Sequence, residues 1–275
     1  MLIIQISDLH IRAERALLNR RYDSAGNLDR CVAAINQLPR QADLVIATGD
    51  LVQFGARAEY ACLREILDKL HAPLLLLPGN HDNRQKLRDS FPEHDYLTLY
   101  PDSCRFVCDD YPLRIIALDT VIDGEVEGAI GTEQLEWLDD QLAARPEKPT
   151  LIAMHHPPFS GMIDFGNKPS CADGPALAAL LQDHPQVRKV ISGHLHRAIA
   201  TGFAQTQGTV APSTAVSFGI PFFPDTPFYR TDEPVGFQIH VWADSTDDSA
   251  VITHTVSLAC DTQAAKIFAI ADETA

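Results

Sequence analysis

The stretch that decides the fold is LLLLPGNHD, residues 74–82. Four consecutive leucines are typical of a strand buried on both faces, and the Pro-Gly pair that follows ends that strand. The next three residues, Asn80, His81 and Asp82, are polar and can bind a metal ion or move a proton. The pattern therefore predicts a buried strand that carries reactive side chains at its carboxyl end.

Four other stretches repeat this arrangement. They are Leu2–Ile6 before Ser7-Asp8-Leu9-His10, Leu44–Ala47 before Thr48-Gly49-Asp50, Leu151–Met154 before His155-His156, and Val190–Ser192 before Gly193-His194-Leu195-His196. Nearly continuous apolar runs suit strands in sheets that are covered by helices. Such sheets carry their functional sites at the carboxyl ends of the strands. We therefore expect five strand ends to converge on one site.

The side chains at these five ends are oxygen and nitrogen donors. They are Asp8, His10, Asp50, Asn80, His155, His194 and His196, with His81 and His156 beside them. Carboxylates, an amide and imidazoles without a thiolate suit Mn²⁺, Fe²⁺ or Fe³⁺, Zn²⁺ or Co²⁺. Seven ligands are too many for one tetrahedral ion, but they suit two divalent ions that share a carboxylate. The sequence therefore predicts a dinuclear metal centre.

The motifs DLH, GD, GNHD, HH and GHLH, in this order, resemble those of the calcineurin-like metallophosphoesterases. More narrowly, they are similar to those of the class III cyclic nucleotide phosphodiesterases and the bacterial glycerophosphodiesterases. The resemblance runs from Met1 to about Ser213. It implies an α/β fold with mixed sheets, a four-layer αββα sandwich. We expect residues 1–213 to form the phosphoesterase domain and residues 214–275 to form a C-terminal hairpin, cap or oligomerisation segment that completes the sheet.

The resemblance also implies a role for each ligand. One ion would be held by Asp8, His10, Asp50 and His196, and Asp50 would bridge to a second ion held by Asn80, His155 and His194. His81 corresponds to a histidine that contacts the phosphoryl group, where it would stabilise developing charge or protonate the leaving oxygen. The predicted catalytic residues are thus His81, Asp50 and Asn80, and the predicted substrate-binding residues are Asn80, His81 and His196.

The chain departs from the family pattern after His196. The phosphodiesterases it resembles commonly carry a histidine that reaches toward the substrate, whereas Ser213–Gly219 contains none. This departure leaves the substrate contacts open and does not affect the metal ligands. We expect the loop Phe159–Gly174 to form a wall of the substrate pocket. The aromatic and proline-rich stretch Ile220–Asp232 is interpreted either as a partner surface or lid, or as a packed crossover.

Composition limits the partners. The formal net charge is −15, and no run of lysine or arginine occurs, which argues against long nucleic acid as a substrate. A small anionic phosphodiester remains compatible, because bound metal ions reverse the local charge.

No apolar run approaches the roughly 20 residues of a membrane span, and no basic segment precedes the first apolar run. The six cysteines lack paired spacing. We therefore expect a cytoplasmic protein without a membrane partner, and a homo-oligomer of dimer size or larger.

The predicted reaction is metal-dependent hydrolysis of a phosphodiester, with 3′,5′-cyclic AMP as the favoured substrate. Glycerophosphodiesters are the main alternative, and phosphomonoesters and nucleotide pyrophosphates are further ones, because all four reactions use the same ligands. A non-enzymatic scaffold is disfavoured, because scaffolds that keep such a fold tend to lose ligands and every predicted ligand is present.

Overall fold

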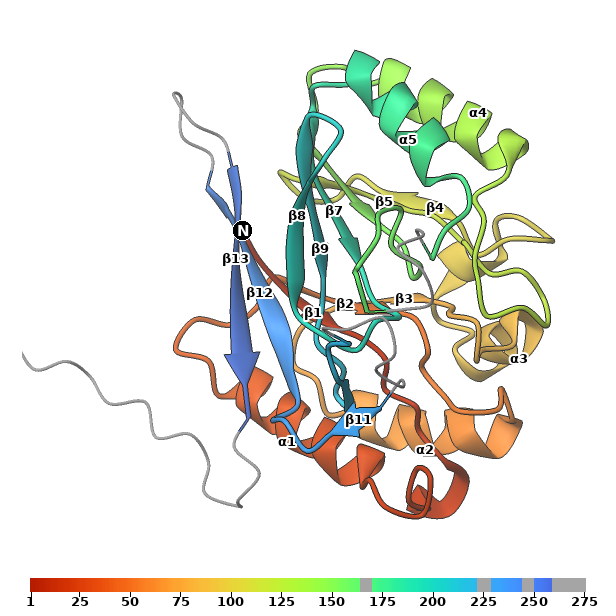
Figure 1. Ribbon diagram of the computed structural model, residues 1–275, viewed down its shortest axis with the longest axis vertical. Coiled ribbons are helices and arrows are strands. Elements are labelled where there is room, and N and C mark those ends of the chain that lie inside the picture. Colours follow the sequence, from red (N-terminus) through yellow and green to blue (C-terminus); the bar gives the residue numbers. More distant parts are fainter. Residues whose placement is uncertain (164–169, 222–228, 244–249, 259–275) are drawn as a thin grey trace, which may run out of the picture.

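The computed structural model describes residues 1–163, 170–221, 229–243 and 250–258. Two large sheets lie face to face, as Figure 1 shows. The first has the order β13-β12-β1-β2-β3, with β1 (Leu2–Ile6), β2 (Leu44–Thr48), β3 (Leu74–Leu77), β12 (Gly236–Ala243) and β13 (Ala250–Ser257). The second has the order β4-β5-β6-β7-β9-β8, with β4 (Phe106–Cys108), β5 (Arg114–Ala117), β6 (Thr150–Ala153), β7 (Val187–Ser192), β8 (Ile199–Phe203) and β9 (Thr206–Val210).

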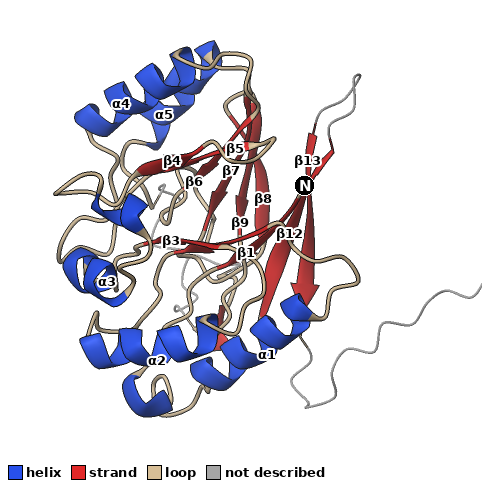
Figure 2. Cartoon of the chain, turned by 180° about the vertical axis from the view of Figure 1, so that it is seen from behind, coloured by secondary structure: helices blue, strands red, loops and turns tan. Residues whose placement is uncertain are grey.

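Helices cover the outer face of each sheet, so the molecule has four layers (Figure 2). The helices are α1 (Ser24–Asn36), α2 (Arg57–Leu67), α3 (Arg84–Ser90), α4 (Thr132–Ala143) and α5 (Gly174–Leu180). The first three pack on the first sheet, and the last two pack on the second. Short 3₁₀ helices span Ala13–Arg15, Asp95–Thr98 and Leu181–Asp183. The expected αββα sandwich is confirmed.

The continuous apolar runs reflect burial on both faces of a strand. In β1, the side chain of Ile3 packs between the sheets, whereas those of Ile4 and Ile6 pack under the helices. Strands β1, β2 and β3 are parallel to one another, as are β5, β6 and β7. Parallel strands end at a common edge, and this edge carries the five polar motifs.

The C-terminal hairpin extends the first sheet. Strand β12 pairs antiparallel with β1, and β13 pairs antiparallel with β12. A two-stranded sheet of β10 (Ser217–Phe218) and β11 (Arg230–Thr231) lies at the same end of the molecule as the polar motifs. The end of the expected C-terminal segment, residues 259–275, lies outside the described residues. Among the described helices, none has the length and apolar character that a membrane crossing requires.

A lysine is buried between the two sheets. Lys189 of β7 has no exposed surface, and its Nζ donates to Gln207 Oε1 at 2.6 Å and to the carbonyl of Val251 at 3.2 Å. Burial lowers the pKa of Lys189 from 10.5 to about 8. Between pH 8 and pH 10.5, Lys189 is protonated in the unfolded chain but deprotonated in the folded protein. The contribution of Lys189 to the free energy of unfolding therefore increases as the pH rises from about 8 to 10.5.

We expect Lys189→Met to raise the melting temperature at pH 7, where the folded protein carries the full desolvation penalty of the buried charge. The gain over wild type should shrink as the pH rises from 8 to 10.5. Thermal unfolding followed by circular dichroism at several pH values measures it. Lys86→Met, a change of a partly exposed lysine on α3, is the control. A gain that stays constant with pH would contradict a lysine whose pKa is lowered.

Candidate active site

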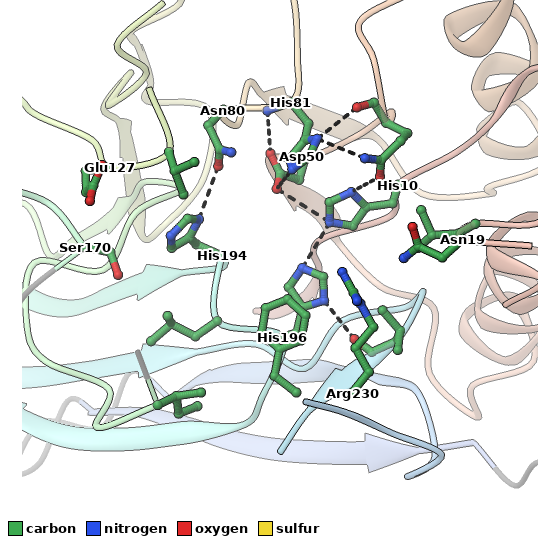
Figure 3. A pocket seen from close by; sticks show the side chains of 17 residues that line it. His10, Asn19, Asp50, Asn80, His81, Glu127, Ser170, His194, His196 and Arg230 are labelled. Carbon is green, nitrogen blue, oxygen red and sulfur yellow. Dashed lines mark hydrogen bonds and ion pairs between the residues drawn. The ribbon is translucent and has the colours of Figure 1, made fainter. Parts of the chain in front are cut away.

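Side chains that could hold a metal ion gather in two groups at the common edge of the sheets: Asp8, His10, Asp50 and His196 in the first, and His155, His156 and His194 in the second. Figure 3 shows those that line the cavity, His10, Asp50, His194 and His196, together with Asn80. In the first group, donor atoms of Asp8, His10, Asp50 and His196 lie within 4.8 Å of one another. His10 Nε2 is 3.5 Å from Asp50 Oδ2, and His196 Nε2 is 3.6 Å from Asp8 Oδ1. All four side chains are buried, so this group forms a compact site with little access for water.

The second group surrounds Asn80. Its Oδ1 lies 3.3 Å from His155 Nε2 and 3.2 Å from His194 Nδ1. Asp50 Oδ1 lies 3.3 Å from His155 Nε2, whereas Asp50 Oδ2 faces His10 of the first group. Asp50 thus directs one oxygen toward each group. The structure brings all seven predicted ligands together, in two groups joined by this carboxylate.

Hydrogen bonds fix the orientations of three imidazole rings. His155 Nδ1 donates to the carbonyl of Thr48 at 2.7 Å, His196 Nδ1 donates to that of Val216 at 2.8 Å, and His10 Nδ1 lies 3.0 Å from Gln53 Oε1. The Nε2 atoms therefore point into the site, and those of His10 and His196 are 3.0 Å apart. Burial lowers the pKa of His10 to about 4 and that of His196 well below its usual range, so both rings are neutral.

The unprotonated Nε2 atoms of His10 and His196 face each other at 3.0 Å, and a bound cation would accept the lone pairs of both. Burial raises the pKa of Asp8 to about 7, because the other groups around it supply too little positive charge. The donor set and its charge therefore fit divalent ions. Asp50 differs from Asp8: burial would raise its pKa, but His155 and His10 hold that pKa well below the usual range. The charge of Asp50 in turn raises the pKa of His155 to about 9, against the effect of burial.

The backbone of five predicted metal ligands lies in the left-handed region. The φ angles are 54° at Asp8, 46° at His10, 49° at Asp50, 72° at His194 and 53° at His196. Residues other than glycine adopt this region rarely, although aspartate, asparagine and histidine tolerate it best. The chain leaves each strand abruptly, and this turn directs the side chains into the site. Strain of this kind concentrates at functional sites.

Gly79 allows the loop after β3 to approach the other ligands. A Cβ atom at this position would lie 2.2 Å from the backbone nitrogen of Asp50 and 2.8 Å from His155 Nε2. Neither neighbour can move without disturbing a ligand. The glycine of the GNHD motif is therefore required by the close packing of two ligand-bearing loops, in addition to its effect as a strand terminator.

His81 lies beside the predicted metal ligands and remains partly exposed. Its Nδ1 donates to the carbonyl of Gln53 at 2.8 Å, and its Nε2 lies 4.0 Å from Asp50 Oδ2. The backbone nitrogen of His81 also donates to Asp50 Oδ1 at 2.9 Å. Because Nδ1 is engaged by a carbonyl, Nε2 is the atom available to a substrate. It can donate a proton when the ring is doubly protonated.

His156, which follows the ligand His155, uses both ring nitrogens within the protein. Its Nδ1 is 2.8 Å from Thr120 Oγ1, and its Nε2 donates to the carbonyl of Val126 at 3.1 Å. Burial keeps its pKa well below the usual range. His156 therefore anchors the loop that carries Val126, and it has no nitrogen left for a metal ion.

The sequence analysis missed the supporting residue Gln53, and it considered Asp82 only as a residue that can bind a metal ion or move a proton. Gln53 contacts both His10 and His81, and Asp82 accepts hydrogen bonds from the backbone nitrogens of Gly79, Leu51 and Val52. The position of Asp82 within the GNHD motif was a signal, although its carboxylate joins two loops and does not face the metal ligands. No spacing in the sequence indicates Gln53.

A cavity of about 350 Å³ opens over the ligands. It is lined by His10, Leu18, Asn19, Asp50, Gln53, Asn80, His81, Val126, Glu127, Ile163, Ser170, His194, Leu195, His196, Val216, Phe218 and Arg230. Much of the wall away from the ligands is apolar. The ring of Phe218 stacks on that of His196, with 3.9 Å between centroids and 9° between planes. The stretch that lacks the family histidine thus supplies a phenylalanine to the cavity.

The predicted pocket walls are described in part. In the loop Phe159–Gly174, Ile163 and Ser170 line the cavity, while Asp164, Phe165 and Asn167 lie outside the described residues. In Ile220–Asp232 the aromatic residues Phe222, Phe223 and Phe228 also lie outside them. Arg230, which the sequence analysis did not single out, lines the cavity.

A family model described as calcineurin-like phosphoesterase matches residues 1–198. A probable glycerophosphodiester phosphodiesterase from Arcobacter nitrofigilis is 33% identical over 256 residues, which cover 93% of this chain and 92% of the relative. A 3′,5′-cyclic adenosine monophosphate phosphodiesterase from Escherichia coli K12 is 28% identical over 216 residues, covering 78% and 77%. Among solved structures, a dimetal phosphatase from Danio rerio has a TM-score of 0.62 at 17% identity, covers 94% of this chain and 98% of its own, and shares the fold.

Proposed function

The chain belongs to the calcineurin-like phosphoesterase family and is a metal-dependent phosphodiesterase, and we propose that its substrates are 3′,5′-cyclic nucleotides, cyclic AMP among them. We further propose that the centre holds two divalent ions, drawn from manganese, iron, zinc and cobalt. One is held by Asp8, His10, Asp50 and His196, and the other by Asp50, Asn80, His155 and His194. Two observations support this assignment: the ligands form two groups, and the carboxylate of Asp50 directs one oxygen toward each group.

The observation that carries the choice of substrate is the apolar wall of the cavity. Val216 and Phe218 lie beside the ligand His196, and Leu18 and Ile163 continue the surface. A glycerol group is polar throughout, so an apolar wall would leave its hydroxyl groups without partners. A nucleoside has a flat apolar face that suits such a wall. The volume of the cavity lies within the range of small-molecule sites.

The residues of this chain prepare the reaction. When bound, a pair of divalent ions supplies a hydroxide near neutral pH and positive charge for the phosphoryl oxygens. Asp50 and Asn80 hold the two groups of ligands in one arrangement, and the buried rings exclude bulk water. His81 directs Nε2 toward the cavity, where a doubly protonated ring can donate to the departing oxygen. Asn80, His81 and His196 are the proposed substrate contacts nearest the phosphate.

Glycerophosphodiesters are the second candidate. They are favoured by the names of two relatives, a probable glycerophosphodiester phosphodiesterase from Arcobacter nitrofigilis and a glycerophosphodiester phosphodiesterase from Enterobacter lignolyticus, which match 93% and 85% of this chain. A probable cyclic nucleotide phosphodiesterase from Synechococcus matches 88%, so coverage does not separate the two classes. The cyclic AMP phosphodiesterase from Escherichia coli K12 covers 78%.

We expect protein stripped with a chelator and reloaded with Mn²⁺ to release AMP from 3′,5′-cyclic AMP. Chromatography of the products, with the chelated protein as the control, measures the reaction. Release of glycerol 3-phosphate from glycerophosphoethanolamine, without release of AMP, would overturn the cyclic nucleotide assignment and leave the metal-dependent diesterase in place.

The five described cysteines are unpaired, and four of them are buried: Cys31, Cys62, Cys104 and Cys171. Free thiols are typical of reducing compartments, and we propose a cytoplasmic enzyme on this ground. The homo-oligomer expected from the sequence stays a prediction.

A further inference from the structure

The substrate proposed for this cavity is an anion, yet Arg230 is the one lysine or arginine among the described residues that line it. Figure 3 shows the Arg230 side chain pointing into the cavity from β11. Glu127 lines the same cavity, so the positive charge is not part of a general basic surface. A single cation at the mouth of an anion-binding cavity calls for a specific role.

Strand pairing places Arg230 in the cavity. Strands β10 and β11 are antiparallel, and Arg230 lies directly opposite Phe218 in the register. Opposed residues in such a pair share a face of the sheet. The Cζ atom of Arg230 is 6.0 Å from the centroid of the Phe218 ring, whose stacking on the ligand His196 ties the pair to the metal site. The pairing continues at Gly219, whose nitrogen donates to the carbonyl of Tyr229 at 2.8 Å.

Neighbouring arginines neutralise the nearby carboxylates. Asp232 pairs with Arg21 at 2.6 Å, and Glu233 pairs with Arg197 at 2.9 Å. Across residues 1–163, 170–221, 229–243 and 250–258, no carboxylate forms an ion pair with Arg230. Arg230 is exposed, and its guanidinium offers five donors that a bound anion can use in place of water.

We propose that Arg230 binds the non-bridging oxygens of the substrate phosphate. The inference rests on the proposed function to the extent that the substrate is a phosphodiester anion. Planar guanidinium groups match phosphate oxygens with paired hydrogen bonds. Arginine also stays charged at every working pH, whereas a histidine loses its charge near pH 6.5. Binding of the anion should therefore persist at alkaline pH.

The test compares Arg230→Ala and Arg230→Lys with Arg21→Ala, an arginine whose charge is already paired with Asp232. With Mn²⁺-loaded protein, Arg230→Ala should raise KM about 30-fold, as expected for loss of a charged hydrogen-bonding pair, and kcat should fall less. Arg230→Lys should recover part of the loss. Calorimetry should show the same weakening for inorganic phosphate, while metal analysis finds two ions per chain in every variant.

Arg230→His supplies a readout that a structural role would not affect. Relative to wild type, its KM should be near normal at pH 6 and should rise about tenfold by pH 8.5, as the introduced imidazole loses its charge. The other titratable groups facing the cavity are common to both proteins, so the ratio removes their contribution. They are His10, His81, His194, His196, Asp50 and Glu127.

The inference is overturned if Arg230→Ala has the KM and phosphate affinity of Arg21→Ala, or if the ratio for Arg230→His stays flat with pH. Each variant is assayed with cyclic AMP and with bis(p-nitrophenyl) phosphate. Hydrolysis of the aryl diester alone would refute the cyclic nucleotide assignment. The role of Arg230 is then tested by comparing the KM values of the variants for the aryl diester.

Discussion

Asn80→Ala is expected to lower turnover of cyclic AMP at least about 100-fold and to reduce the bound metal from two ions per chain toward one. The amide oxygen of Asn80 lies 3.2–3.3 Å from His194 and His155, in the group proposed to hold the second ion. Its loss removes the oxygen donor that lies between the imidazoles of His194 and His155. A catalytic ion contributes several kcal/mol to transition-state stabilisation, and each 1.4 kcal/mol is about tenfold in rate.

Metal analysis after dialysis and single-substrate kinetics measure the two effects together. Asn36→Ala is a matched control, because Asn36 bonds only to the backbone of Lys69 and His71 among the described residues and lies away from the cavity. Full occupancy with normal turnover in Asn80→Ala would show that Asn80 is not a ligand. Normal occupancy with low turnover would instead place Asn80 on the substrate.

His81→Ala is expected to lower kcat for cyclic AMP by about 100- to 10,000-fold, the range typical of a lost general acid. His81 Nε2 faces the cavity because Nδ1 is held by the carbonyl of Gln53. The departing ribose oxygen is a poor leaving group and needs a proton. For bis(p-nitrophenyl) phosphate, whose leaving group is stable as an anion, the loss should be far smaller.

The comparison of substrates separates the two roles that the family resemblance left open for His81. An equal loss with both substrates would mean that the ring stabilises charge on the phosphoryl group and does not protonate the leaving oxygen. His71→Ala, a change of an exposed histidine, should leave both rates unchanged. Unchanged rates in His81→Ala would remove this residue from the mechanism.

The sequence predicted the parts of the site that depend on local pattern. Each ligand follows an apolar strand within a few residues, so the strand ends and their order along the chain sufficed to bring Asp8, Asp50 and His155 to one edge. The fold followed from the same pattern, because continuous apolar runs require cover on both faces.

The parts that were missed depend on contacts distant in the sequence. Gln53 contacts His10 across 43 residues, and Arg230 reaches the cavity only because β11 pairs with β10. The spacing of apolar residues along the sequence does not indicate such contacts. The loop geometry at the ligands was also hidden, because the left-handed backbone at His194 and His196 occurs in residues whose type already pointed to metal binding.

The left-handed backbone at Asp8, His10, Asp50, His194 and His196 makes this site costly to keep. At each position glycine would adopt the observed φ without strain and relieve roughly 1 kcal/mol. A thermostability screen blind to hydrolysis would therefore enrich glycine at these positions and discard the ligands. Any engineering for heat resistance should hold these five codons fixed and seek its gains in the helices on the outer faces.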